Sequence, residues 1–273
     1  MKHDTFAGYP ADSLELPQRA LLTAWDCLVR YQEDLVLVGG LAIRHLTSPP
    51  RDGMPGPVTL DVDFGISIAA SGGQYASIKD TLSGHGFRWD GKRFMRSFDG
   101  MNLFIDLLTD DDRQTTGTVM VDNGLPVSLI PGINRALQCH RTLRIQGRNL
   151  IGAHQAHSIR VAEAGPLLVL KLNAFGGRKA PKDVHDVLYL AMNYLDGTEK
   201  ALEAFQAEKS AGNPGMAPAL QALAGHFQDA DSLGPLSCAA FRMDNRHLDP
   251  DRRDESLRIR EQCVTLAQEL LRN

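Results

Sequence analysis

Apolar and polar positions in the first 160 residues repeat mainly with the two-residue period of β-strands. A short apolar run over 35–38 ends at Gly39-Gly40, and residues 58–66 alternate between apolar and polar side chains. This alternation predicts a strand whose two faces differ. The apolar face would carry Val58, Leu60, Val62, Phe64 and Ile66, and the other face Thr59, Asp61, Asp63 and Gly65.

Other segments of this first part are predicted from the same spacing rules and from turn residues. Strands are expected over 87–90, 93–98, 101–108, 118–121, 126–130, 142–146 and 158–162, with turns at Asp90-Gly91 and Asp99-Gly100. Helices are expected over 14–33, 41–47 and 73–84, and a loop over the proline-rich stretch 48–57.

After residue 163 the apolar spacing becomes helical. Helices are predicted over 164–176, 181–195, 198–210, 216–228 and 251–272. Gly176-Gly177 is expected to end the first of them, and Pro181 suits the first turn of the second. The pattern predicts an α+β fold, with a mixed β-sheet domain over 1–162 and a helical domain over 163–273.

The composition is that of a soluble globular protein, with 43% hydrophobic and 23% charged residues among 273. The chain contains no apolar run long enough to span a membrane, and its four cysteines form no C-x-x-C pair. We therefore expect a cytoplasmic protein without membrane contact, disulfides or a structural zinc site.

Positive charge is concentrated in one part of the chain, although the whole carries −4. Residues 141–182 hold eight basic side chains and a single acid, Glu163, for a net charge of +7, which leaves −11 for the remainder. Such a separation can attract an anionic ligand such as a nucleotide or polyanion. Solvated arginines around a β-hairpin would produce the same count.

Three aspartates stand where a strand pattern calls for other residues. Asp61 and Asp63 are two apart and therefore share a strand face, and Asp106 interrupts the apolar run 103–108. An ionised carboxylate in a buried strand is costly unless a cation or strong donor compensates it. If the two strands are neighbours, three carboxylates converge and could bind Mg²⁺, which prefers oxygen ligands. Alternatively, the pair faces solvent and Asp106 lies at a strand end.

The glycine pair Gly39-Gly40 follows an apolar strand and opens a helix. Backbone N–H groups there can meet phosphate oxygens without an intervening side chain, although a tight strand-to-helix turn needs the same residues. The dinucleotide-binding and P-loop glycine motifs are both missing from the sequence.

A second charged group lies in the helical part. Lys171 and Arg178 are seven residues apart, so they share a helix face and could grip one polyanion or form a solvated basic edge. Asp183 and Asp186 fall in the first turn of the next helix, where the helix dipole also favours carboxylates. For Asp183 we expect pairing with Lys171 or Arg178.

The order of these motifs resembles the polymerase-β-like nucleotidyltransferase superfamily. The similarity rests on a strand, Gly39-Gly40, a helix, Thr59-Leu60-Asp61-Val62-Asp63 and Phe104-Ile105-Asp106-Leu107-Leu108. Leu167-Leu168-Val169-Leu170-Lys171-Leu172-Asn173-Ala174, Arg178 and Lys182-Asp183-Val184-His185-Asp186-Val187-Leu188 look like the AbiEii/AbiGii toxin branch. The chain departs from the usual pattern at Leu41, where Ser or Thr is frequent, and in the long spacing from Gly40 to Asp61.

The resemblance implies a bilobed protein that uses Mg²⁺ to transfer a nucleotide from an NTP such as ATP. Gly39 and Gly40 would hold phosphates, Asp61 and Asp63 would bind metal, and Asp106 would be the third carboxylate and help to deprotonate the acceptor. Lys171, with Arg178, would neutralise the triphosphate, and Asp183 and Asp186 would complete the nucleotide-binding residues.

The same resemblance implies an RNA-modifying toxin of a toxin–antitoxin or phage-defence system. Its acceptor would be a tRNA-like RNA, and its partner a cognate antitoxin protein. Two alternatives remain open: transfer to a small molecule or a protein, and a nucleotide-binding module that has lost activity.

Overall fold

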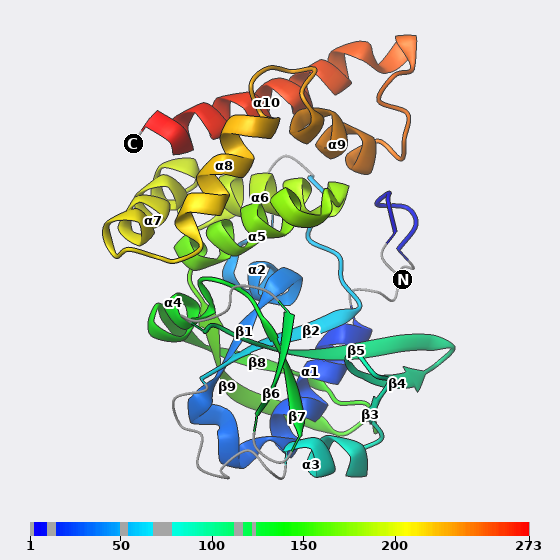
Figure 1. Ribbon diagram of the computed structural model, residues 1–273. Coiled ribbons are helices and arrows are strands. Elements are labelled where there is room, and N and C mark those ends of the chain that lie inside the picture. Colours follow the sequence, from blue (N-terminus) through cyan, green and yellow to red (C-terminus); the bar gives the residue numbers. More distant parts are fainter. Residues whose placement is uncertain are drawn as a thin grey trace. The chain divides into compact units, whose positions relative to one another are not determined.

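A computed structural model describes residues 3–9, 15–49, 54–67, 78–111, 117–121 and 124–272 (Figure 1). Its contacts divide the chain into two compact units. The sheet unit comprises residues 11–45 and 59–163, and the helical unit comprises 1–10, 46–58 and 164–273. The predicted α+β class is confirmed, because a mixed β-sheet with helices precedes a helical region that runs from α5 to α10.

The described strands of the sheet unit form one mixed sheet. Its central order is β3-β4-β5-β2-β1-β9-β8, β7 also pairs with β5, and β6 pairs with β7. β2 runs parallel to β5 and antiparallel to β1, and β1 is parallel to β9. The strands are β1 (Leu35–Val38), β2 (Asp61–Ile66), β3 (Arg88–Trp89), β4 (Phe94–Phe98), β5 (Met101–Thr109), β6 (Gly117–Val121), β7 (Leu125–Leu129), β8 (His140–Arg148) and β9 (His154–Ala162).

Helices cover the two faces of this sheet around β2. Helix α1 (Leu16–Cys27) brings Trp25 against Phe64, with ring centroids 5.9 Å apart. On the other face, Ile133 of α4 (Ile133–Gln138) lies where a side chain at Gly65 would be. The alternation seen in the sequence therefore directs apolar side chains of β2 toward α1 and leaves its two aspartates on the face of α4. The unit also contains η2 (Val29–Asp34), α2 (Gly39–Leu46) and α3 (Ile78–Gly84).

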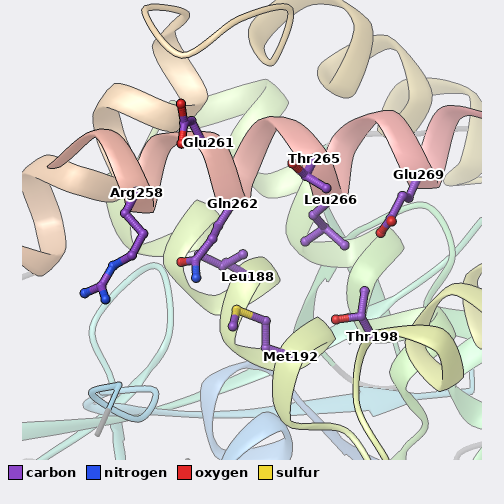
Figure 2. A pocket seen from close by; sticks show the side chains of 9 residues that line it. All are labelled: Leu188, Met192, Thr198, Arg258, Glu261, Gln262, Thr265, Leu266 and Glu269. Carbon is purple, nitrogen blue, oxygen red and sulfur yellow. The ribbon is translucent and has the colours of Figure 1, made fainter. Parts of the chain in front are cut away.

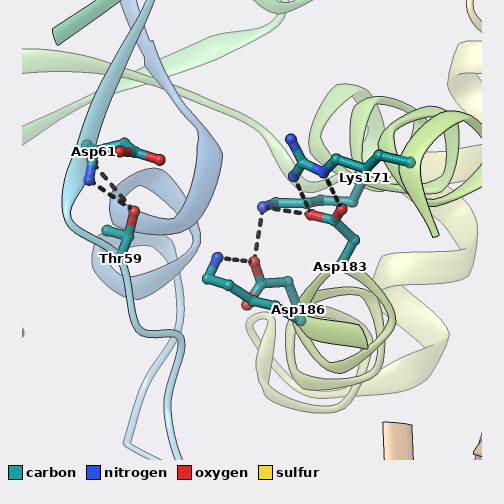
Figure 3. Close-up of polar contacts among 7 residues, drawn as sticks. Thr59, Asp61, Lys171, Asp183 and Asp186 are labelled. Carbon is teal, nitrogen blue, oxygen red and sulfur yellow. Dashed lines mark hydrogen bonds and ion pairs between the residues drawn. The ribbon is translucent and has the colours of Figure 1, made fainter. Parts of the chain in front are cut away.

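Several boundaries in the sheet unit differ from the prediction. The helix expected over 14–33 ends at Cys27 and continues as the tighter 3₁₀ helix η2, which buries Tyr31 before β1 begins. β2 begins at Asp61 rather than at residue 58, and Thr59, which precedes it, is buried. The Thr59 hydroxyl accepts the Asp61 N–H at 3.1 Å, a local bond that competes with strand pairing (Figure 3). Helix α4 was not predicted, and residues 73–77 of another predicted helix lie outside the described residues.

The helical unit follows the predicted pattern closely. Its elements are α5 (Ala164–Arg178), α6 (Pro181–Asn193), α7 (Thr198–Ser210), α8 (Met216–His226), α9 (Leu233–Arg242), η3 (Pro250–Arg252) and α10 (Arg253–Arg272). Pro181 occupies the first turn of α6 as expected. The glycine pair Gly176-Gly177 does not end α5, which continues to Arg178 and stops where Lys179 takes a positive φ of 55°. Helix α9 was not predicted.

Residues 1–10 and 46–58 group with these helices. The predicted domain boundary at residue 162 had placed both segments in the first domain. Thr47 forms a β-bridge with Tyr194, and Phe6 packs on Phe241 with ring centroids 6.2 Å apart. Among the described residues, no helix is both long and apolar enough to cross a membrane.

Candidate functional site

Three carboxylates meet on one face of the sheet unit. In the parallel pair β2–β5, Asp63 lies opposite Asp106, and Asp61 lies two residues before Asp63 on the same face. The strands lie side by side although two other strands separate them along the sequence. We call Asp61, Asp63 and Asp106 the carboxylate cluster; they are the residues that the sequence singled out as metal-binding and catalytic.

Arg93 supplies the positive charge that the sequence required for Asp106 but did not identify. Its Nε donates to Asp106 Oδ1 at 3.0 Å and its Nη1 to Asp61 Oδ1 at 3.1 Å, while Nη2 forms a further short contact with Asp106. The guanidinium also lies 4.6 Å from the centroid of the Phe104 ring. Arg93 therefore links the carboxylates of both strands.

The environment of Asp106 changes its protonation. Burial raises the pKa of this carboxyl to about 7, and the negative charges of Asp63 and Asp61 act in the same direction. Arg93 opposes the shift by its charge and its hydrogen bonds. Asp106 therefore exchanges a proton close to neutral pH.

Gly39 lies directly against the cluster. It adopts a φ of +73°, and the strand residue before it, Val38, pairs with Asp63. A Cβ atom at Gly39 would overlap the Asp63 carboxylate, so glycine is required here both for its backbone conformation and for space. Gly40 follows in the first turn of α2, as the sequence predicted for a strand-to-helix junction.

The side chains as they stand do not form a metal cage. Among the described residues, no three His, Cys, Asp or Glu side chains are arranged so that they could hold a metal ion. Asp61 and Asp106 are instead bonded to Arg93. The donor set nevertheless suits a hard divalent cation, because three carboxylates face one arginine and retain an excess of negative charge.

The helical unit holds the other predicted residues in a buried charge network (Figure 3). Asp183 receives two hydrogen bonds from Arg178, at 2.7 and 2.6 Å, and lies 3.5 Å from Lys171. Asp186 lies 2.7 Å from both Lys171 and Lys182. The expected pairing of Asp183 is thus confirmed with both candidate partners. The helix dipole alone does not account for Asp186, since two lysines contact it.

Burial of Asp183 and Asp186 would by itself disfavour their ionised forms. The nearby cations together outweigh this effect, Lys171 and Arg178 at Asp183 and Lys171 and Lys182 at Asp186, so the pKa of each carboxyl is lowered. Lys171 and Arg178 therefore contact the same carboxylate, Asp183 of their own unit, and binding of a polyanion by this pair stays a prediction.

Two further features of the helical unit were not found in the sequence. The thiols of Cys238 in α9 and Cys263 in α10 are free and buried, and they lie near each other and near His185. Residues 185, 238 and 263 are far apart along the chain, and no local pattern connects them. A pocket of about 300 Å³ lies between α6, the start of α7 and α10 (Figure 2). It presents Arg258, Glu261 and Glu269 together with apolar side chains, and none of the predicted site residues lines it.

Comparison with known proteins assigns the chain to no family. No protein-family model matches the sequence, and neither does any curated protein.

Proposed function

We propose that the chain is a Mg²⁺-dependent nucleotidyltransferase that moves a nucleoside monophosphate from an NTP to an acceptor hydroxyl. The observation that carries this proposal is the carboxylate cluster of two neighbouring strands, placed against Gly39 at the start of a helix. This arrangement agrees with the motif order that resembles the polymerase-β-like superfamily and its AbiEii/AbiGii branch. We accordingly propose an RNA acceptor and the role of a toxin whose cognate antitoxin is a protein partner.

Asp61, Asp63 and Asp106 would hold the metal, since they are three oxygen donors on adjacent strands. When bound, Mg²⁺ would stabilise charge that develops on the phosphate oxygens. Arg93 forms ion pairs with two of the three carboxylates, so it would have to release at least one of them before the metal binds. Its removal from the cluster leaves negative charge that favours a divalent cation.

Asp106 fits the role of general base. Burial beside Asp63 makes this carboxylate a stronger base than an exposed aspartate, with a pKa of about 7 in the metal-free cluster. The acceptor hydroxyl would transfer its proton to this group as its oxygen attacks the α-phosphate, and the bond from the α-phosphorus to the bridging oxygen would break to release pyrophosphate. Gly39 and Gly40 would let phosphate oxygens approach the backbone N–H groups at the start of α2.

The helical unit would contribute positive charge. Its buried network joins the cations of Lys171, Arg178 and Lys182 to the carboxylates of Asp183 and Asp186. Arg178 is the most accessible member, with 44% of its side chain exposed. We therefore assign phosphate contact to Arg178 and, behind it, Lys171, with Asp183 and Asp186 holding both in position.

The test is transfer of label from each α-³²P-labelled NTP, with Mg²⁺, to total RNA and to a panel of small molecules and proteins. We expect label in RNA, and no transfer by a folded Asp63→Asn variant. Asp80→Asn is the matched control, because Asp80 is an exposed aspartate of α3. Label in small molecules or protein would favour the alternative acceptors, and NTP binding without any transfer would favour a binding module. Full transfer by Asp63→Asn would remove the proposed site.

A further inference from the structure

The hairpin of β8 and β9 carries four arginines and three histidines and contains no acidic residue between 140 and 162. Its strands are longer than the sequence predicted, nine residues each, and are paired along their whole length. β8 forms the end of the strand order next to β9. The hairpin is therefore a broad, positively charged part of the sheet.

The two faces of the hairpin differ sharply. One face packs toward α1, where Ile145 and Ile159 are buried and Gly147 lies against Gln18. The opposite face is exposed, apart from Arg160, which is half-buried. It consists of Thr142, Arg144, Gln146 and Arg148 on β8 and their partners Arg160, Ser158, Ala156 and His154 on β9. We call these eight residues the basic face.

Most of the charge on the basic face is not neutralised. Within the part of the chain that the structure describes, neither Arg144 nor Arg148 forms an ion pair. Arg160 pairs with Glu33, whose side chain is 90% exposed. Apart from the arginines, the face presents small or polar side chains and no large apolar one. Such a surface suits an extended polyanion better than a protein partner, which would need apolar anchors.

The basic face lies on the same side of the sheet as the carboxylate cluster. Val38 pairs with Asp63, and its neighbour Leu37 pairs with Val161, so side-chain direction can be followed from β2 through β1 to β9. This path connects four residues that lie side by side on neighbouring strands and on one face of the sheet: Asp63, Val38, Ala162 and His140. From that level, every second residue along β8 and β9 points to the same face. These positions include Arg160 on β9 and Arg144 and Arg148 on β8.

Sheet geometry gives the span between the two features. Three strand spacings of about 4.8 Å and four residues of about 3.3 Å place Arg144 roughly 20 Å from Asp63 and, four residues further, Arg148 roughly 30 Å away. Along the axis of duplex DNA each strand carries a phosphate about every 3.4 Å, and an extended single strand covers more distance per nucleotide. Helix α4 packs on this face at Gly65, so an RNA strand would pass around α4, and several nucleotides would separate Arg148 from the carboxylate cluster.

We propose that the basic face binds the sugar-phosphate backbone of the acceptor RNA and presents its end to the carboxylate cluster. This inference rests on the proposed function for the identity of the ligand. Arg144 and Arg148 would contact phosphates several nucleotides from the reacting end. The competing explanation is that charges on the edge strand only prevent it from pairing with other strands, which predicts no RNA dependence at all.

The experiment measures binding of fluorescein-labelled single-stranded RNAs of 24 and 4 nucleotides by anisotropy, with the full chain and at several salt concentrations. Arg144→Ala/Arg148→Ala should weaken binding of the 24-mer by about tenfold and reduce the salt slope by about 1.4, because two phosphate contacts are lost. The gain in affinity from 4 to 24 nucleotides should largely disappear. Arg144→Lys/Arg148→Lys should retain most of the affinity for the 24-mer, since lysine keeps the positive charge.

The matched control is Arg30→Ala/Arg88→Ala, which removes two exposed arginines elsewhere in the sheet unit. It should leave the affinity for the 24-mer and its salt slope unchanged, and circular dichroism checks the fold of each variant. Equal losses in the control and the test variant would overturn the proposal, as would unchanged binding by the folded Arg144/Arg148 variant. Loss of affinity for an acidic protein in place of RNA would also overturn it.

The same assay separates this inference from the proposed function. RNA binding that depends on Arg144 and Arg148, in a protein that transfers no label from any NTP, would support the basic face and refute the transferase. Transfer of label to RNA at the wild-type rate by Arg144→Ala/Arg148→Ala, with unchanged KM for the 24-mer, would retain the transferase and refute the basic face.

Discussion

Replacing Arg93 by glutamine removes the positive charge that contacts both Asp61 and Asp106. Arg93 is the residue that the structure adds to the predicted site, so its removal tests the electrostatics on which the proposed chemistry depends. Lys92→Gln is the matched control, because it removes the same charge from an exposed neighbouring position. We expect Arg93→Gln to destabilise the sheet unit and Lys92→Gln to have almost no effect.

The magnitude follows from burial and geometry. The side chains of Arg93, Asp61 and Asp106 are 21%, 14% and 16% exposed, so water screens their attraction only in part. Breaking a buried pair by removing one partner costs about 3–5 kcal/mol. Because these three groups retain some contact with water, we expect a loss of about 3 kcal/mol in the free energy of unfolding near pH 9, at the low end of that range.

The loss should depend on pH. In the wild type, Asp106 keeps its proton up to a pKa of about 7, whereas in the unfolded chain it loses the proton near pH 4. The folded state therefore binds more protons between these values, and this group makes the protein less stable as the pH rises from about 4 to 7. Without Arg93 the pKa of Asp106 rises further, and each added unit costs about 1.4 kcal/mol above the new pKa. The cost of Arg93→Gln should thus be larger at pH 9 than at pH 6.

Urea unfolding at pH 6 and pH 9, followed by tryptophan fluorescence, measures this difference. Both tryptophans of the chain, Trp25 and Trp89, belong to the sheet unit, so the signal reports on the unit that contains Arg93. A loss of equal size at the two pH values would refute the electrostatic explanation and indicate lost packing on Phe104 instead. Unchanged stability at pH 9 would refute the role of Arg93 altogether.

Two further substitutions and one addition test other parts of the structure. Gly39→Ala should lower stability by more than Gly91→Ala and abolish transfer. Both glycines have positive φ, but only at Gly39 would an added Cβ meet Asp63. Thermal unfolding compares the two variants, and equal losses of stability would contradict the contact. Asp183→Asn should cost about 3–5 kcal/mol at pH 7, because it leaves buried cations without their partner. Since the pKa of Asp183 is lowered in the folded protein, that cost should shrink as the pH falls below 4, and a cost independent of pH would contradict it. Mg²⁺ at ten times its dissociation constant should stabilise the Arg93→Gln variant by about 1.4 kcal/mol in urea unfolding, and no stabilisation would argue against metal binding by the cluster.

Local patterns in the sequence were sufficient to locate most elements of the fold. The alternation over 61–66 and the run 35–38 mark β2 and β1, because a strand with one buried face imposes a two-residue period on its side chains. Arg93 could have been found in the same way. The turn at Asp99-Gly100 pairs Phe98 with Met101, and this register carries Arg93 to the position opposite Asp106.

Other features depended on contacts between distant segments. The parallel pairing of β2 with β5 brings Asp63 to Asp106 across two intervening strands, and no local period encodes which strands become neighbours. Lys182 lies four residues before Asp186 on the same helix, but the second partner of Asp186, Lys171, reaches it only because α5 packs on α6. A periodic sequence can specify which face of a strand or helix is buried, because that choice involves only nearby residues. Which charges meet inside the protein depends on the packing of the whole chain, because each buried carboxylate must find its counter-charge among groups that folding brings together.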